Sequence, residues 1–187
     1  MSDIDLSGFR VAILATDGFE ESELTEPMQA LQDAGAEVVI ASFKVGPVQG
    51  FRHDVKGASV DATLPFEKLK AEDFDAVQLP GGTINADTLR MAAPVQSFLR
   101  QMEAAKKPIA AICHAPWLLV SAGLVSGRKL TSYYTIQDDI KNAGGTWIDE
   151  ALVADDNWVT SRQPKDLPVF NKAMLQLFSK ITVTVLS

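Results

Sequence analysis

Short apolar runs that end in turn residues alternate along the chain with segments of helical periodicity. Residues 9–16 form an apolar run that stops at an Asp-Gly pair, as expected of a fully buried strand. Residues 20–34 then carry apolar side chains at helical spacing, with a glycine after the last of them. Residues 36–43 repeat the strand pattern. The first 43 residues therefore predict a βαβ unit of the kind that builds a parallel sheet.

The strand and helix pattern recurs in the middle of the chain. It predicts strands over 75–80 and 108–113, and helices over 86–107, with a boundary near Pro94, and over 114–122. A parallel sheet between helices is therefore the expected fold class, α/β.

The remaining segments are shorter and more varied. Residues 44–63 predict a hairpin or edge excursion punctuated by glycines. Beyond the middle of the chain we expect a strand near 129–132, a helix over 136–143, a β pair within 147–161 that turns at 155–157, and a helix over 166–179. The tail 181–185 alternates like a strand.

Composition restricts the class of protein. The chain has 187 residues, which fits one domain, with 47% hydrophobic and 22% charged residues, as in folded globular proteins. No apolar run approaches a membrane span, and the first ten residues lack the features of a signal peptide, so we expect a cytoplasmic protein with no membrane partner. A net charge of −7 argues against nucleic acid as a partner, because such binding needs Lys and Arg.

The single cysteine, Cys113, excludes an intrachain disulfide and a Cys-rich zinc site. It falls in Ala-Ile-Cys-His-Ala, which has the small-x-nucleophile-x-small form of a nucleophile elbow between a strand and a helix. Such a turn would strain the cysteine backbone, point its sulfur into a cleft and lower the thiol pKa through the N–H groups of the next helix. The alternative is an inert buried thiol, and the flanking pattern with the adjacent His114 favours the nucleophile.

Two other turns carry unusual chemistry and, in a parallel sheet, lie at the same edge as Cys113. The turn after the first strand is acidic, and the turn after residue 79 contains Gly81 and Gly82, which either only form a turn or present N–H groups to an oxyanion. If His114 acts as a base, a carboxylate must orient it, and the candidates are Glu20 and Asp87. The other acidic residues near the first helix are interpreted as charges that favour its N-terminus; they are Asp17, Glu21, Glu23 and Glu26.

Five segments together resemble the PfpI family, which belongs to the class I glutamine amidotransferase-like superfamily. In the family's order they are residues 11–24, 80–82, 110–116, 123–132 and 138–144, and the likeness runs from about residue 9 to 178. The resemblance implies a single PfpI-like domain over 1–187 with a flavodoxin-like, doubly wound, mainly parallel sheet and helices on both faces. Ala115 departs from the pattern, because many members have glycine there.

The resemblance also implies roles for individual residues. Cys113 corresponds to the nucleophile, Glu20 to the carboxylate hydrogen-bonded to its sulfur, and His114 to the adjacent histidine. Backbone N–H groups of Gly82 and His114 would form the oxyanion site. Asp87 matches an acidic residue that in some members reaches the histidine of a neighbouring subunit, so a homodimer or higher homo-oligomer is expected.

Members of this family have been described with several activities. The preferred hypothesis is a stress-related, cysteine-dependent hydrolase of the glutathione-independent glyoxalase or deglycase type, which acts on small reactive aldehydes or their protein adducts. An intracellular cysteine peptidase that acts on peptides is the alternative enzyme, and a redox sensor or holdase chaperone based on Cys113 is the alternative outside enzymes. No metal or organic cofactor is expected.

Overall fold

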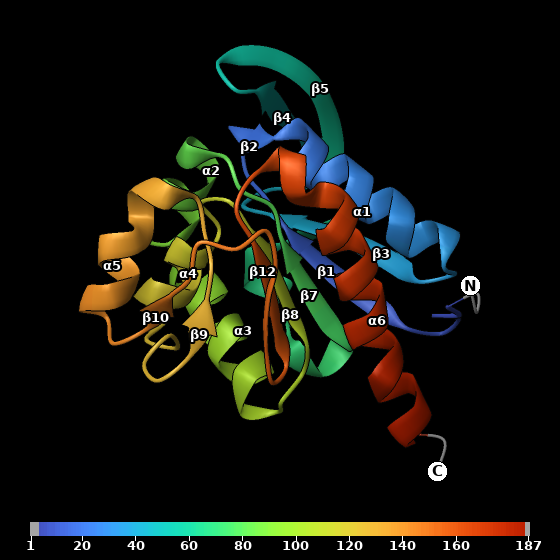
Figure 1. Ribbon diagram of the computed structural model, residues 1–187. Helices are drawn as coiled ribbons and strands as arrows, with labels where there is room; N and C mark the ends of the chain where they lie inside the picture. Colours follow the sequence, from blue (N-terminus) through green and yellow to red (C-terminus); the bar gives the residue numbers. More distant parts are fainter. Residues whose placement is uncertain (1–3, 186–187) are drawn as a thin grey trace.

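A seven-stranded, mostly parallel sheet forms the centre of the computed structural model, which describes residues 4–185 (Figure 1). In spatial order its strands are β11 (Val153–Asp155), β12 (Trp158–Ser161), β8 (Ile109–Ile112), β7 (Ala76–Leu79), β1 (Arg10–Leu14), β3 (Glu37–Ser42) and β6 (Leu64–Pro65). Only the β11–β12 pair is antiparallel. From β3 to β12 the five inner strands follow the order 2-1-3-4-5 of flavodoxin-like sheets, which confirms the predicted fold class.

Helices cover both faces of this sheet (Figure 1). One face packs against α1 (Glu21–Asp33) and α6 (Leu167–Val185), and the other against α2 (Thr83–Leu89), α3 (Ala93–Ala104), α4 (Pro116–Ser121) and α5 (Gln137–Asn142). Within β8, Ile109 and Ala111 face the second group of helices, whereas Ala110 and Ile112 face the first. Every residue of β8 is therefore buried, as its continuous apolar sequence predicts.

Two small sheets lie outside the central one. The predicted hairpin consists of β4 (Gly46–Arg52) and β5 (Val55–Ala62), and it projects beyond the main body of the molecule (Figure 1). Its β4 strand pairs with β2 (Phe19–Glu20), a two-residue strand at the start of α1 that the sequence did not predict. The second sheet pairs β9 (Lys129–Leu130) with β10 (Thr146–Trp147). Short 3-10 turns occur at Phe66–Lys68, Ala71–Asp73, Tyr134–Ile136 and Pro164–Asp166.

Two helical predictions can be compared directly with the structure. The segment 86–107 is divided into α2 and α3, and Pro94 stands in the first turn of α3, which confirms the predicted boundary. The prediction of a strand over 181–185 was wrong, because α6 continues to Val185. Each residue added to an existing helix gains a backbone hydrogen bond, whereas a strand needs a neighbouring strand to pair with.

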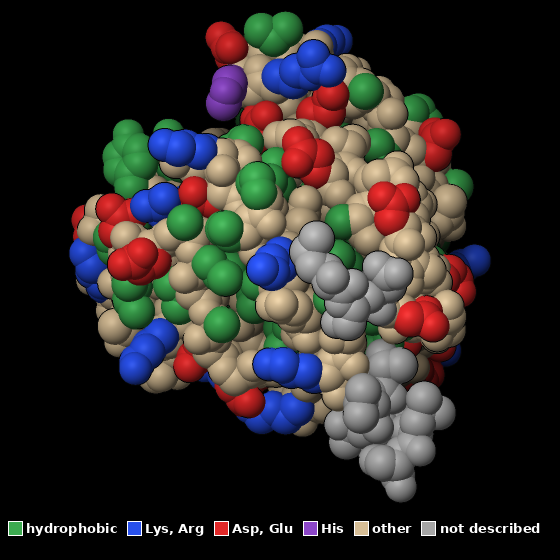
Figure 2. Space-filling view, turned by 45° about the vertical axis from the view of Figure 1, so that its right-hand side comes forward, with side chains coloured by type: hydrophobic (Ala, Val, Ile, Leu, Met, Phe, Trp, Pro, Cys, Tyr) green, Lys and Arg blue, Asp and Glu red, His purple; other side chains and the backbone are tan. Residues whose placement is uncertain are grey.

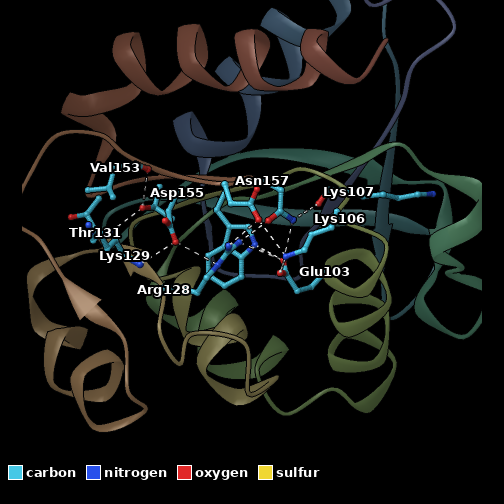
Figure 3. A network of polar contacts seen from close by, with 12 residues as sticks. Glu103, Lys106, Lys107, Arg128, Lys129, Thr131, Val153, Asp155 and Asn157 are labelled. Atoms are coloured by element: carbon cyan, nitrogen blue, oxygen red, sulfur yellow. Dashed lines mark hydrogen bonds and ion pairs between the residues drawn. The ribbon is translucent and has the colours of Figure 1, made fainter. Parts of the chain in front are cut away.

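A network of polar contacts lies at the amino ends of β8 and β12 (Figure 3). The Glu103 carboxylate accepts hydrogen bonds from the Asn157 amide at 3.0 Å and the Trp158 indole at 2.7 Å. The Arg128 guanidinium lies 4.1 Å from the centre of the Trp158 ring and 3.5 Å from the Glu103 carboxylate. Burial alone would raise the pKa of Glu103, but the hydrogen bonds from Asn157, Trp158 and Lys106 outweigh it and lower that pKa.

The surface is mixed in charge. Figure 2 shows basic and acidic side chains interspersed over one face of the molecule, with no large patch of either sign. Within residues 4–185, no helix is both long enough and apolar enough to cross a bilayer.

Candidate active site

Cys113 occupies a strained turn between β8 and α4. Its φ is 62°, in the left-handed region that costs a residue with a side chain about 1–2 kcal/mol. The turn is fixed on both sides, since the Cys113 N–H donates to the Ser161 carbonyl at 3.0 Å and its carbonyl accepts from the Tyr133 N–H at 2.8 Å. Ala115 begins the helical conformation with φ −57°, so a glycine is not required there. The structure thus confirms the predicted elbow.

The three turns at the carboxyl edge of the sheet meet at one cavity of about 730 Å³. Gly18, Gly82 and Cys113 each line it, one from each turn. The tip of the β4–β5 hairpin forms another wall with Phe51, and the His53 side chain, which is 84% exposed, lies at the rim. Cys113 is 7% exposed and lines this cavity.

The carboxyl group beside the sulfur belongs to Glu23. This side chain is fully buried beside Cys113 and accepts the Gly81 N–H at 3.0 Å through Oε2. The expectation that Glu20 contacts the sulfur was therefore wrong. Glu20 precedes α1 with extended backbone, lines the cavity nearer its mouth and accepts the His53 N–H at 2.9 Å through Oε2.

Helical spacing explains the difference between the two glutamates. Glu23, Pro27 and Leu31 lie four residues apart on the buried face of α1, whereas Glu20 lies outside the helix. Glu23 is thus more than a charge that favours the helix N-terminus. The signal in the sequence was a glutamate in register with the apolar positions of an amphipathic helix.

Burial controls the protonation of Glu23 and Cys113. It raises the pKa of Glu23 to about 8, with a further contribution from the charge of Glu20. Burial also raises the pKa of the Cys113 thiol, and a negative charge on Glu23 raises it further. The expected lowering of the thiol pKa by α4 is thus outweighed by burial. Because Glu23 keeps its proton up to about pH 8, the pair carries at most one negative charge at neutral pH.

Two backbone N–H groups also interact with the sulfur. Those of Gly82 and His114 hydrogen-bond to it, and both interactions favour the thiolate. Gly82 has φ 90°, and a Cβ atom there would overlap the Gly18 carbonyl oxygen. A Cβ atom on Gly81 would overlap the Glu23 carboxyl group and lie 2.6 Å from the Cys113 Cβ. The two glycines therefore allow the loop to approach the sulfur closely.

His114 contacts the sulfur directly, with Nδ1 3.2 Å from the Cys113 Sγ. Its Nε2 lies 3.4 Å from the hydroxyl groups of both Thr83 and Thr135, and its ring stacks on Tyr133 at 4.8 Å. Burial lowers the pKa of His114, which favours the neutral imidazole. Two hydroxyl groups thus occupy the place where a carboxylate orienter was expected.

Asp87 does not join this group within its own chain. It lies exposed on α2, outside the residues that line the cavity. Metal binding by protein side chains also has no obvious place in the part of the chain that the structure describes, where no three His, Cys, Asp or Glu side chains gather in a suitable arrangement.

Residues 9–177 of this chain match the DJ-1/PfpI family. The chain belongs to that family. It is 42% identical over 168 residues to "Deglycase TK1284" of Thermococcus kodakarensis, a comparison that covers 90% of this chain and 98% of the relative. It is 37% identical over 168 residues to a Bacillus subtilis protein named "Putative cysteine protease YraA", with 90% and 97% covered.

A solved structure agrees with the sequence relatives. A two-domain protein from Anabaena variabilis, with a DJ-1/ThiJ/PfpI-like and a ferritin-like domain, superimposes with a TM-score of 0.85 and 35% identity. The match covers 90% of this chain and 47% of that protein, so this chain spans about half of its length.

Proposed function

We propose that this protein is a cysteine-dependent hydrolase of small reactive aldehydes or their adducts, of the glutathione-independent glyoxalase or deglycase type. The observation that carries the proposal is the Cys113 sulfur lining a cavity beside a buried Glu23 carboxyl group, whose pKa burial raises to about 8. Aldehyde isomerisation needs a nucleophile and a proton carrier within reach of the same carbon, and this pair provides both. The similarity to a protein named as a deglycase supports the same reaction class.

With methylglyoxal, the Cys113 thiol first loses its proton to water. The thiolate attacks the aldehyde carbon C1 and a C–S bond forms, while Glu23 donates its proton to the new alkoxide, which gives a hemithioacetal and leaves Glu23 as a carboxylate. The Glu23 carboxylate then removes the C1 proton and returns it to C2, while the C1 hydroxyl proton moves to the C2 oxygen. The product is a lactoyl thioester, formed without any net oxidation. Water cleaves the C–S bond and releases lactate and the thiol.

An amine adduct of methylglyoxal reaches the same hemithioacetal through displacement of its amine. The thiolate attacks the hemiaminal carbon, the C–N bond breaks, and the amine leaves with a proton. The resulting hemithioacetal is the one that free methylglyoxal forms. The Gly82 and His114 N–H groups lie where they would stabilise negative charge beside the sulfur.

Turnover without glutathione tests this proposal. Purified protein with methylglyoxal should produce lactate, and Cys113→Ala should abolish production. Glu23→Gln retains a group that can accept the Gly81 N–H but cannot shuttle a proton, so we expect a loss of about 100-fold or more in kcat. Glu20→Gln is the matched control in the same cavity and should lose much less. Equal turnover by Cys113→Ala would rule the proposal out.

Peptide hydrolysis is the second candidate. The same thiolate would form a thioester, with the Gly82 and His114 N–H groups around the oxyanion, and a relative carries a cysteine protease name. Release of a fluorogenic group from short peptides, lost in Cys113→Ala and exceeding aldehyde turnover, would favour this activity over the first.

Three further proposals concern the domain extent, the cellular location and the oligomeric state of the chain. We infer that residues 1–187 act as one PfpI-like unit in the cytoplasm, where a free thiol stays reduced. We also propose a homodimer or larger homo-oligomer in which Asp87 approaches His114 of a second copy. Its exposure on α2 leaves the Asp87 carboxylate accessible to such a copy. Sedimentation of the wild type and Asp87→Asn tests the oligomeric state, and the activity of the two proteins tests the role of Asp87.

A further inference from the structure

The first turn of α1 contains a backbone carbonyl that the helix itself cannot satisfy. In an α-helix the carbonyl of Glu23 accepts the N–H of the residue four positions later. That residue is Pro27, which has no N–H and lies buried inside α1. The Glu23 carbonyl therefore needs a donor from outside the helix, because a buried unpaired carbonyl is unfavourable.

The side chain of Gln78 supplies that donor. Gln78 lies in β7, a strand whose residues are all buried, and its Nε2 donates to the Glu23 carbonyl oxygen at 3.1 Å. The amide is fully buried. Its orientation follows from chemistry, since a carbonyl oxygen only accepts and the amide nitrogen must face it. A side chain of the central sheet thus replaces the hydrogen bond that Pro27 removes.

Burial of this amide costs free energy that an apolar side chain at the same position would not cost. The Gln78 Oε1 atom has no hydrogen-bond partner among the described residues. An apolar side chain, such as the neighbouring Val77 and Leu79, fills a buried strand position without leaving a polar atom unpaired. The contact with Glu23 is the interaction that makes a glutamine useful at this position.

We propose that Gln78 is a positioning residue that fixes Glu23 against Cys113. Glu23 is held twice by β7 and the turn after it: its carbonyl by the Gln78 amide, and its carboxyl group by the Gly81 N–H at 3.0 Å. Together these contacts set where the first turn of α1 lies on the sheet, and hence where the carboxyl group meets the sulfur. Gln78 acts through Glu23 and does not touch the reacting atoms.

The proposal rests on Cys113 being the reactive thiol of the proposed function, but its test does not require aldehyde turnover. The readout is the pH dependence of Cys113 alkylation by iodoacetamide, followed by intact mass, since the chain has one cysteine. The titratable groups around the sulfur are Glu23, His114, Tyr133 and, next to Glu23, Glu20. Of these, only Glu23 has a backbone contact with Gln78.

Gln78→Met keeps the length of the side chain and removes the donor. We expect the alkylation midpoint to fall by about half a pH unit or more, because Glu23 opposes ionisation of the thiol and a displaced Glu23 opposes it less. If methylglyoxal is a substrate, kcat should fall about tenfold with little change in KM. Leu79→Met, on the same strand but facing the other group of helices, is the control for a changed core and should leave the midpoint unaltered.

A second substitution separates positioning from general packing. Pro27→Ala restores a backbone N–H for the Glu23 carbonyl, so it should return the alkylation midpoint of Gln78→Met at least halfway to that of Pro27→Ala alone. If Gln78→Met does not fold, folding of the double variant with the midpoint of Pro27→Ala supports the proposal. The proposal is overturned if the alkylation midpoint of Gln78→Met is unchanged, or if the double variant has the same shifted midpoint as Gln78→Met. It is also overturned if neither Gln78→Met nor the double variant folds. If the wild type forms no lactate but the variants show the expected alkylation midpoints, the proposed function is contradicted and the role of Gln78 is not.

Discussion

At the residue scale, the main feature of this protein is a carboxyl group that is buried where it can hold a proton at neutral pH. Glu23 has no exposed surface, and burial raises its pKa from 4.5 to about 8. A charged carboxylate at this position would face the Cys113 sulfur, so the two groups compete for one negative charge. Because Glu23 keeps its proton at neutral pH, the charge that would oppose ionisation of the thiol is absent there.

The raised pKa of Glu23 predicts a pH dependence of stability. Between pH 4.5 and about 8 the unfolded chain has lost the Glu23 proton and the folded chain retains it. Rising pH therefore lowers the free energy of unfolding, by at most about 1.4 kcal/mol per pH unit from this group. In Glu23→Gln this loss should disappear, so the variant gains stability relative to wild type at pH 8 compared with pH 5.

Urea denaturation of both proteins at the two pH values measures this difference. Glu20→Gln serves as the control for removal of a nearby carboxylate and should track the wild type more closely. A stability difference between wild type and Glu23→Gln that is the same at pH 5 and pH 8 would show that Glu23 titrates normally.

Residue patterns predicted part of this site and missed part of it. The elbow at Cys113 and the Gly81-Gly82 turn could be predicted because their local sequences restrict the backbone. The choice between Glu20 and Glu23 could not be made from charge, since both belong to one acidic stretch. It depends on where α1 begins, and helix boundaries are set by tertiary contacts such as the pairing of β2 with β4.

At the element scale, the β4–β5 hairpin is fastened to α1 by acidic side chains. The Glu21 carboxylate pairs with Arg52 at 2.8 Å and accepts the Ala58 N–H at 2.6 Å, and both bonds lower its pKa. Glu20 accepts the N–H of His53 at the hairpin tip. Because Phe51 and His53 line the cavity, these contacts hold one wall of the candidate active site.

Glu21→Ala should loosen that wall. We expect KM for methylglyoxal to rise about threefold to tenfold with a smaller change in kcat, because the cysteine and Glu23 stay in place. Hydrogen exchange should become faster at residues 50–58 and remain unchanged in β8. Unaltered exchange in the hairpin, or a loss confined to kcat, would contradict this role for Glu21.

The polar network of Figure 3 is expected to contribute to stability and not to catalysis. Glu103→Gln should lower the free energy of unfolding at pH 7 by about 1–3 kcal/mol, because it weakens the bonds from Asn157 and Trp158 and the pairing with Arg128. Since the pKa of Glu103 is lowered in the folded protein, this contribution exists above pH 4.5 and is lost as pH falls through the folded value. Denaturation at pH 7 and pH 4 measures it, and kcat should remain that of the wild type.

Elements with strong periodicity were predicted well, and those defined by pairing were not. Strands β1, β7 and β8 are continuous apolar runs that only a buried sheet accommodates. The two residues of β2 carry no pattern of their own, and their strand conformation depends on β4. Residues 181–185 show the converse, since an alternating pattern lies at the end of a helix that was already formed.

At the scale of the whole molecule, the cavity has a clear electrostatic character. Among its lining residues Glu20, Glu23 and Asp54 are acidic, and none is Lys or Arg. The net charge of −7 has the same sign. A substrate that carries a negative charge near the reacting carbon would meet unfavourable potential, whereas a cationic carrier would be attracted.

This charge distribution predicts selectivity among methylglyoxal adducts. An adduct on the guanidinium of N-acetylarginine amide should show a higher kcat/KM than the adduct on N-acetylcysteine, which carries a carboxylate. The preference should weaken at high salt and in Asp54→Asn, while turnover of uncharged methylglyoxal stays within about twofold. The Debye length falls about fivefold between 20 mM and 500 mM salt, so equal preference at these two concentrations would show that charge does not select the substrate.

The central sheet also separates two tasks in space. Strand β8 is four residues long, so roughly 13 Å lies between the sulfur at its carboxyl end and the Glu103 network at its amino end. Changes at that distance with no shared partner combine additively. Thermal tolerance can therefore be engineered at one rim of the sheet and substrate preference at the other, and libraries built separately for the two rims can be merged without testing every combination.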